Sequence, residues 1–267
     1  MNSLITNVTV AGIFAGPSFQ SEMISQSLLW ERLDILDQNV NWYKVRQFDN
    51  YEGWINKFYT IKNESSNLNF ATYIETNQIG VIHSYPDEEC NPIISCTFGS
   101  RLPVVETKKI KNQWWHQIIL PNLNTGWIQD NGFKKGKSIR EIIKQIAELF
   151  LGTPYVWGGR SSYGFDCSGF VQTIFKFCGI NLPRDSKDQF NYGNLKEHSK
   201  EENNVGDLIF FLKNDMINHI AISLGNDNYI HSSGYIKINS FNSKNENYDD
   251  SLFSMYYCSK SIENLIK

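Results

Sequence analysis

The residues with the clearest chemical potential lie just past the middle of the chain. There, Phe165-Asp166-Cys167-Ser168-Gly169-Phe170 follows a glycine-containing loop and leads into an apolar run. A thiol attacks carbonyl carbons as the thiolate, and a helix N-terminus lowers the pKa of a cysteine. The N–H groups of the first helical turn can also stabilise an oxyanion. The segment therefore predicts that Cys167 is a nucleophile at the start of a helix.

A cysteine nucleophile needs an imidazole to take its proton. Of the five histidines, His219 opens the apolar run Ile220–Leu224, and His231 follows 12 residues later. We expect strands joined by a hairpin turn at Gly225-Asn226-Asp227-Asn228, which would bring the two imidazoles together. The pattern predicts one histidine as the base and the other as the residue that orients it.

Two helices and a series of strands are predicted around these residues. Ser138 and Glu141 form a capping box, and the apolar residues after it recur with a period of about 3.6 until Gly152 and Pro154 end the helix. A second helix from about Cys167 is apolar over so wide an arc that it should be buried. Strands are expected at Leu208–Leu212, His219–Leu224 and Tyr229–His231, with a last strand at Leu252–Tyr257.

The first half of the chain reads as short strands, and its pattern occurs twice. Arg32-Leu33, Trp42-Tyr43 and Gly53-Trp54-Ile55 make one copy; Arg101-Leu102, Trp114-Trp115 and Gly126-Trp127-Ile128 make the other. The step from Trp to Gly-Trp is 12 residues in one copy and 13 in the other. Alternation and β-branched content predict strands at Val8–Phe14, Arg32–Leu36, Trp42–Val45, Ile79–His83 and Trp114–Ile119.

This repeat resembles the bacterial SH3-like barrel, a small β domain often found beside cell-wall hydrolases. The resemblance implies two such barrels, with the tryptophans in their cores or grooves. An unrelated β-sandwich is the alternative that the strand pattern leaves open. The chain has 267 residues, a length that suggests two or three domains. We place three, at 1–65, 70–135 and 136–267.

The composition argues against several classes of function. A net charge of −3 gives no electrostatic reason to bind nucleic acid, and no stretch approaches the roughly 18 apolar residues of a membrane span. The five cysteines include no C-x-x-C pair, so no structural zinc site is expected. Their odd number favours thiols in a reducing compartment. No metal or organic cofactor is implied.

The N-terminus shows no export signal. The first basic residue is Arg32, and the apolar run Val8–Phe14 is interrupted by Thr9 and Gly12. If Met1 is the true start, we expect a cytoplasmic protein; a removed signal peptide would mean a periplasmic or secreted one. We expect a monomer, although no feature of the sequence reports the oligomeric state.

Five linked motifs occur in a fixed order between residues 153 and 231. They read P-Y-x-W-G-G, D-C-S-G-F-V, G-D-L-x-F-F, H-x-x-I-x-L-G and a third polar residue, here His231. This order resembles the NlpC-type cysteine peptidases of bacterial cell walls, a papain-like family with an α+β catalytic domain. The resemblance implies that Cys167 is the nucleophile, His219 the base and His231 the orienting residue. It also implies that Tyr155 lies beside the nucleophile and helps to hold the substrate carbonyl.

A narrower resemblance rests on Leu182-Pro183-Arg184-Asp185-Ser186 with Gln189 after it. This stretch is similar to the P-R-D-S-x-x-Q segment of γ-D-glutamyl-L-diamino acid endopeptidases, in which two SH3-like domains precede the catalytic domain. The resemblance implies that Asp185 and Ser186 bind the free α-amine of an N-terminal L-Ala. A buried ammonium needs such a carboxylate partner. Alternatively, Asp185 could only cap a helix that begins at Ser186, and Arg184 could only brace the loop.

Three more residues belong to the implied substrate pocket. Asp166 and Ser168 flank the nucleophile in the sequence. In the similar endopeptidases a tyrosine of the first SH3-like domain closes the pocket, and Tyr51 is the candidate for that role in this chain. The two barrels would then make the cleft a dead end for longer peptides.

The resemblance predicts hydrolysis of the γ-D-glutamyl–diamino acid bond in peptidoglycan stem peptides that begin with L-Ala, and a role in peptide recycling. The sequence does not distinguish diaminopimelate from lysine as the diamino acid. Three alternatives stay open: a wall amidase or acyltransferase of the same fold, an inactive wall-binding module, and an interaction protein whose barrels bind proline-rich ligands.

Overall fold

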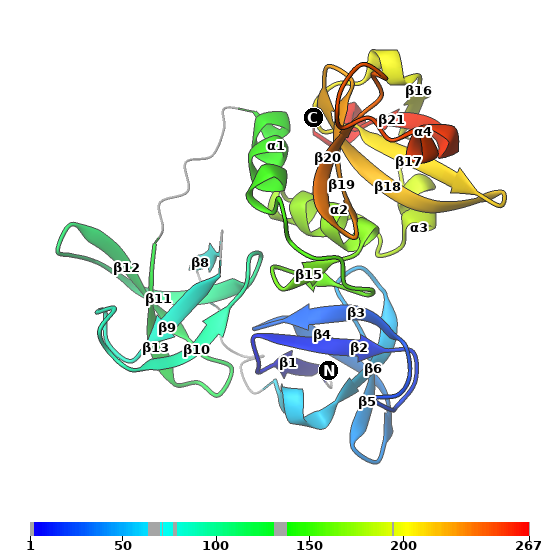
Figure 1. The fold of residues 1–267 in the computed structure, drawn as a ribbon. Helices are drawn as coiled ribbons and strands as arrows, with labels where there is room; N and C mark the ends of the chain where they lie inside the picture. The colour runs from blue at the N-terminus through cyan, green and yellow to red at the C-terminus, as the bar shows by residue number, and fades with distance from the viewer. Residues whose placement is uncertain are drawn as a thin grey trace. The chain divides into compact units, whose positions relative to one another are not determined.

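The chain divides into two compact units, Met1–Lys134 and Lys135–Lys267. The computed structural model describes residues 3–63, 70, 72–76, 79–130, 138–193 and 195–266. Figure 1 colours the first unit blue to green and the second green to red. The predicted domain bounds at 1–65, 70–135 and 136–267 stay a prediction.

The first unit begins with an antiparallel sheet of order β3-β2-β6-β5-β4-β1-β7. Alternation along the strands creates its core, as in β2, where every second side chain is buried. The fully buried members of that core are Leu4, Ala11, Ile13, Leu33, Val45 and Ile55. The elements are β1 (Ser3–Thr6), β2 (Val10–Phe14), β3 (Met23–Leu28), β4 (Arg32–Asn39), β5 (Trp42–Arg46), β6 (Glu52–Asn56), a 3-10 turn (Lys57–Tyr59) and β7 (Thr60–Lys62).

A second antiparallel sheet follows, of order β10-β9-β13-β12-β11-β8. This order matches β3-β2-β6-β5-β4-β1 strand for strand, so the predicted internal repeat is confirmed. Its core includes Ile82, Leu102, Ile118 and Ile128. The strands are β8 (Thr72–Glu75), β9 (Gly80–His83), β10 (Pro92–Cys96), β11 (Arg101–Ile110), β12 (Gln113–Ile119) and β13 (Thr125–Gln129).

The same steric requirement explains the glycine in each of the two Gly-Trp-Ile elements. A Cβ at Gly53 in β6 would lie 2.5 Å from Cγ2 of Ile13 in β2. A Cβ at Gly126 in β13 would likewise lie 2.5 Å from Cγ2 of Ile82 in β9. Glycine at these positions therefore lets an isoleucine of the adjacent strand enter each barrel core.

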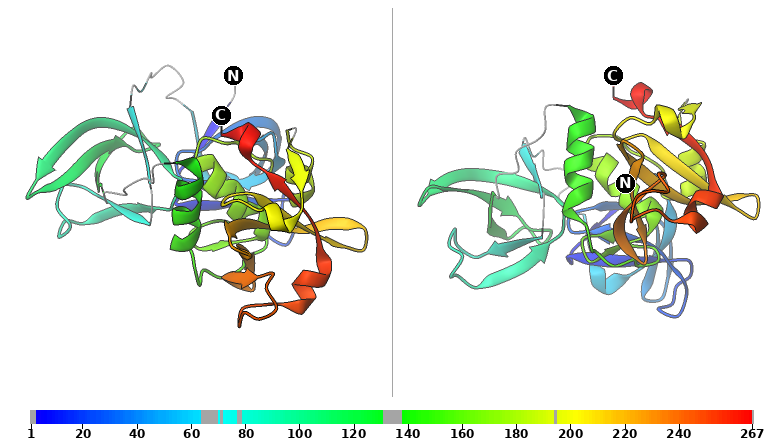
Figure 2. Two further views of the ribbon diagram at one scale, coloured as in Figure 1. Left: turned by 90° about the horizontal axis from the view of Figure 1, so that it is seen from above. Right: turned by 45° about the horizontal axis from the view of Figure 1, so that its top comes forward.

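The second unit combines helices with a sheet of order β16-β21-β17-β18-β19-β20. Helix α2 contacts β18 and β19, and α1 contacts α2; Figure 2 shows both helices beside the sheet. The elements are α1 (Ile139–Leu149), β14 (Arg160–Ser161), β15 (Gly164–Phe165), α2 (Cys167–Phe177), α3 (Ser186–Phe190), β16 (Lys196–His198), a 3-10 turn (Lys200–Glu202), β17 (Leu208–Lys213), β18 (Met216–Gly225), β19 (Asn228–Ser233), β20 (Tyr235–Ser240), α4 (Asp250–Met255), β21 (Tyr256–Ser261) and a 3-10 turn (Glu263–Leu265).

The predicted start of α1 is confirmed. Ser138 Oγ accepts from the Glu141 N–H at 3.2 Å, and the Glu141 carboxylate accepts from the Ser138 N–H at 3.2 Å. Ten of the eleven residues of α2 are buried, as its apolar arc predicted. Strand β18 begins three residues earlier than expected, so His219 is its fourth residue rather than its first.

The predicted last strand at Leu252–Tyr257 is wrong. Helix α4 occupies most of that range, and β21 starts only at Tyr256. Asp249 is the reason, because its carboxylate accepts a 3.0 Å hydrogen bond from the Leu252 N–H and so caps a helix. Strand β20 was not predicted, because its two isoleucines stand among polar residues.

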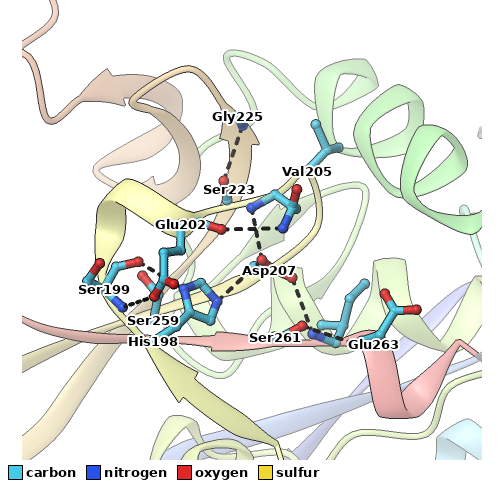
Figure 3. Close-up of polar contacts among 12 residues, drawn as sticks. His198, Ser199, Glu202, Val205, Asp207, Ser223, Gly225, Ser259, Ser261 and Glu263 are labelled. Carbon is cyan, nitrogen blue, oxygen red and sulfur yellow. Dashed lines mark hydrogen bonds and ion pairs between the residues drawn. The ribbon is translucent and has the colours of Figure 1, made fainter.

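Asp207, the aspartate of the G-D-L motif, is a structural centre of the second unit (Figure 3). It is fully buried. Oδ1 accepts from Nη1 of Arg140 at 2.9 Å and from the Ile262 N–H at 3.2 Å. Oδ2 accepts from the Asn204 N–H at 2.9 Å and lies 3.3 Å from Nε2 of His198. One carboxylate therefore joins α1, β16, the entry to β17 and the end of β21.

We expect Asp207→Ala to destabilise the second unit by about 3 kcal/mol, because it removes the buried carboxylate that pairs with the partly buried guanidinium of Arg140. Amide hydrogen exchange in β17 and β18 measures this locally in a chain of two units. Glu263→Ala is the matched control: it removes the exposed second partner of Arg140 and should cost less than about 1 kcal/mol. Equal losses in the two variants would contradict the structural role of Asp207.

Candidate active site

Cys167 is the first residue of α2, and Asp166 caps that helix. Oδ1 of Asp166 accepts a 2.7 Å hydrogen bond from the Gly169 N–H. A Cβ at Gly169 would lie 2.1 Å from the carbonyl oxygen of Gly159, and that oxygen also accepts from the Asp166 N–H at 3.0 Å. The loop before β14 therefore packs directly on the first turn of α2 and fixes where the helix begins.

The Cys167 thiol lies against β18, with only 8% of the residue exposed. The backbone of Ile220, the residue after His219, hydrogen-bonds to its sulfur. Burial raises the pKa of the Cys167 thiol to about 12, and the charge of Asp166 adds to the rise. The sequence predicted a pKa lowered by the helix N-terminus. That prediction is wrong here, because lost hydration outweighs the stabilisation by nearby backbone groups and by Arg184.

The two histidines predicted to be neighbours are in contact. The hairpin forms as expected, with Gly225 paired to Asn228 across the turn. Nε2 of His219 lies 2.7 Å from Nδ1 of His231. Burial lowers the pKa of His219 to about 3 and that of His231 to about 4, so both imidazoles are neutral near pH 7.

Asn239 in β20 extends this pair and was missed in the sequence. Its Oδ1 lies 2.9 Å from Nε2 of His231, and its Nδ2 donates to the carbonyl of Asn247 at 2.7 Å. Strand β20 pairs with β19 so that Asn239 lies opposite Tyr229, two residues from His231. The isoleucines at 236 and 238, which alternate with polar residues, are the signal that could have revealed this strand.

A buried arginine braces the first turn of α2. Arg184 is 2% exposed, and its Nη1 donates to Oδ1 of Asp166 and to Oγ of Ser168, each at 3.0 Å. Its Nη2 donates to Oδ2 of Asp166. The charge of Asp166 is therefore matched inside the protein, beside Cys167. A contact of Asp166 or Ser168 with substrate stays a prediction.

Helix α3 is tied to the same turn. Gln189 is fully buried, and its Nε2 donates to the carbonyls of Ser168 at 3.0 Å and Pro183 at 2.8 Å. Asp185 occupies the N-cap position of α3, but its side chain makes no cap hydrogen bond. The contacts of Gln189 with Pro183 and Ser168 therefore hold the segment with Asp185 and Ser186 close to the start of α2.

The two tyrosines of the predicted site lie in different units. Burial raises the pKa of Tyr155, and the charges of Cys167 and Asp166 add to the rise, so the phenol lies within electrostatic range of Cys167. Tyr51 lies in the first unit, in the turn before β6, where its carbonyl accepts from the Gln47 N–H at 2.9 Å. The role of Tyr51 in the pocket stays a prediction.

Across the residues that the structure describes, no cluster of three or more His, Cys, Asp or Glu side chains could hold a metal ion. The same residues include no helix with the length and apolar character to cross a membrane. All five cysteines are thiols.

A helix that opens on a buried cysteine and packs on an antiparallel sheet with a histidine pair defines the papain-like class of thiol hydrolases. Residues 152–256 match the NlpC/P60 family, and residues 13–57 match the bacterial dipeptidyl-peptidase Sh3 domain. A gamma-D-glutamyl-L-lysine dipeptidyl-peptidase of Bacillus cereus is 31% identical over 232 residues, covering 79% of this chain and 68% of that protein. Dipeptidyl-peptidase 6 of Lysinibacillus sphaericus is 25% identical over 246 residues, covering 87% and 88%.

The crystal structure of an NlpC/P60 family protein from Bacillus cereus has the same fold, with a TM-score of 0.82 at 22% identity over 97% of this chain and 99% of that one. The chain belongs to the NlpC/P60 family. It is a cysteine peptidase that acts on peptidoglycan-derived substrates.

Proposed function

We propose that this peptidase, acting as a monomer, hydrolyses the bond between D-glutamate, through its γ-carboxyl, and the diamino acid of stem peptides with a free N-terminal L-Ala. The observation that carries the proposal is the position of the Asp185 segment, which Gln189 ties to the helix turn that begins with Cys167. A carboxylate near the nucleophile suits a short peptide bound by its ammonium group. The gamma-D-glutamyl-L-lysine dipeptidyl-peptidase relatives support the same bond.

In the proposed mechanism the sulfur of Cys167 attacks the γ-carbonyl carbon while His219 accepts the thiol proton. Because thiol and imidazole are both neutral at rest, transfer of the proton accompanies the attack. The first-turn N–H groups of α2 and the Tyr155 hydroxyl stabilise the oxyanion. His219 then returns the proton to the departing amine of the diamino acid, which leaves a thioester on Cys167. Water, deprotonated by His219, releases the L-Ala-D-Glu dipeptide and restores the thiol.

Selectivity for a free amine follows from the charges around the nucleophile. Asp166 faces the buried guanidinium of Arg184. We assign the substrate ammonium to Asp185, because Gln189 ties the Asp185 segment to the helix turn that begins with Cys167. Ser186 adds a hydroxyl beside it. An N-acylated peptide lacks the positive charge and would gain no ion pair with Asp185.

We expect kcat/KM to follow a broad bell against pH. As the pH falls, the base is lost when the histidine pair takes up a proton, at about 3 to 4, well below the ordinary histidine value of about 6.5. As the pH rises, the substrate ammonium is lost near its own pKa of about 8. An acid limb near 6.5, or no decline above about 8, would contradict this assignment.

Peptides with a free L-Ala amine arise only after release from the glycan. We therefore propose a role in recycling such peptides, in the cytoplasm. Fractionation of cells that make the native protein tests the location, and recovery of the protein outside the cell membrane would refute it.

Product analysis tests the bond. Purified protein is incubated with L-Ala-γ-D-Glu-L-Lys and with the meso-diaminopimelate peptide, and the products are identified by mass spectrometry. We expect L-Ala-D-Glu and the free diamino acid from at least one of them. Cleavage between L-Ala and D-Glu, or no cleavage of either peptide, would overturn the proposed bond.

A further inference from the structure

Asn239 closes a line of hydrogen bonds that begins at the proposed base. Nε2 of His219 contacts Nδ1 of His231 at 2.7 Å, and Nε2 of His231 contacts Oδ1 of Asn239 at 2.9 Å. Nδ2 of Asn239 then donates to the carbonyl of Asn247 at 2.7 Å. That carbonyl also accepts from the Ser240 N–H at 3.2 Å, so β20 holds it in place. The line crosses three strands and ends in the loop before α4.

The Asn247 carbonyl at the end of this line determines which nitrogen of each imidazole carries the proton. A backbone carbonyl only accepts, so the amide nitrogen of Asn239 faces Asn247 and its oxygen faces His231. That oxygen also only accepts, so Nε2 of His231 carries the proton. A neutral His231 then has a lone pair on Nδ1, to which Nε2–H of His219 donates. Nδ1 of His219 is left as a proton acceptor.

We propose that Asn239 is a positioning residue that sets the tautomer of His231 and, through it, of His219, so that Nδ1 of His219 receives the thiol proton. This inference rests on the proposed roles of Cys167 and His219. Rotation of either imidazole, or the opposite tautomer, would present an N–H to the thiol and remove the base.

The groups around the pair explain why a neutral amide suits this position. Lys237 on β20 disfavours the protonated form of His231, and Asp249 before α4 favours it. Tyr229 packs on the His231 ring at 5.5 Å between ring centres, and the Cys167 thiol lies by the backbone next to His219. An amide adds no net charge to this set. Its hydrogen bond favours the protonated form of His231 less than burial disfavours it, so the pKa of His231 stays at about 4 and both imidazoles remain neutral near pH 7.

Asn239→Leu removes both amide contacts while keeping a similar size, and we expect kcat/KM to fall on the order of 10²-fold, the lower range for loss of a general base. Asn245→Ala is the matched control. Asn245 is exposed and lies in the same loop, where its Nδ2 donates to Oγ of Ser240 at 3.0 Å, so this change loosens the loop without touching the histidines. We expect it to alter kcat/KM less than twofold.

Asn239→Asp keeps the acceptor for His231 and adds a negative charge. We expect it to recover most of the activity lost in Asn239→Leu near neutral pH. Because the charge favours the imidazolium, the acid limb of kcat/KM should move to higher pH. Unchanged profiles in both Asn239 variants would overturn the proposal.

The decisive measurement is the ring ¹⁵N spectrum of the whole protein labelled at histidine, which reports the tautomers without any substrate. We expect His219 and His231 both protonated at Nε2, and mixed tautomers in Asn239→Leu but not in Asn245→Ala. A His231 protonated at Nδ1 in the unaltered protein would overturn the inference whether or not the enzyme cleaves a peptide. Conversely, the expected spectrum together with an uncleaved peptide would remove the proposed function and leave the hydrogen-bond assignment standing.

Discussion

Replacing Cys167 by serine should lower kcat/KM for the free-amine tripeptide by about 10⁴-fold or more. The hydroxyl is a poorer nucleophile than the thiol and gives up its proton less readily. The neutral imidazole of His219, whose pKa is lowered by burial, has little power to remove it. Steady-state kinetics with the tripeptide measures the loss, and the unchanged size of the side chain keeps the fold intact.

Cys178→Ser is the control for this experiment. Cys178 caps the other end of α2, roughly 16 Å from Cys167 along an eleven-residue helix. The change removes a thiol from the same helix and should leave kcat/KM within twofold. Residual activity above about 1% in Cys167→Ser, or a comparable loss in Cys178→Ser, would exclude Cys167 as the nucleophile.

The second large effect is expected at Asp185. Asp185→Asn should lower kcat/KM for the free-amine peptide by about 10²-fold, since truncating one partner of a buried charged pair costs 2–5 kcal/mol. The same change should not lower the slow cleavage of the N-acetylated peptide. The ratio of the two kcat/KM values, measured in one competition assay, therefore collapses toward one.

Asp188 provides a matched carboxylate in the same helix. It lies in the first turn of α3 and is exposed, so Asp188→Asn removes one negative charge from the same short helix. We expect the preference for the free amine to survive in this variant. Equal effects at the two positions would indicate a general electrostatic attraction, and an unchanged preference in Asp185→Asn would place the amine site elsewhere.

Local signals in the sequence predicted much of the fold. The capping box at Ser138, the apolar arc of α2 and the turn after β18 each depend on a few neighbouring residues, and each forms as expected. The repeat in the first half was visible because Gly53 and Gly126 meet the same steric demand in each copy. Such local requirements are visible in the sequence as particular residue types at fixed spacings.

Long-range polar contacts left no comparable pattern. Arg184 could be read as a brace, but its ion pair with Asp166 joins residues 18 apart in the sequence. The contact of Asn239 with His231 depends on the register of β19 and β20, which the sequence does not display. Asp249 was overlooked as a helix cap, and a last strand was expected where α4 forms.

The raised pKa of Cys167 was missed for a different reason. A helix N-terminus is visible in a sequence, and it favours the thiolate. The extent of burial is not visible until β18 covers the thiol, and burial acts in the opposite direction. The proximity of His219 and His231 could thus be predicted from the sequence, while the protonation states of the thiol and the imidazoles required the three-dimensional structure.

The most direct test of the central claim is labelling with L-Ala-γ-D-Glu in which a chloromethyl ketone replaces the bond to the diamino acid, followed by peptide mapping. The thiol that attacks the γ-carbonyl in turnover would instead form a stable thioether, with loss of chloride. We predict a single label on Cys167, and labelling at least about tenfold slower when the L-Ala amine is acetylated or Asp185 is changed to Asn. A label on another cysteine, or equal rates for the free and acetylated reagents, would contradict an amine-gated peptidase that uses Cys167.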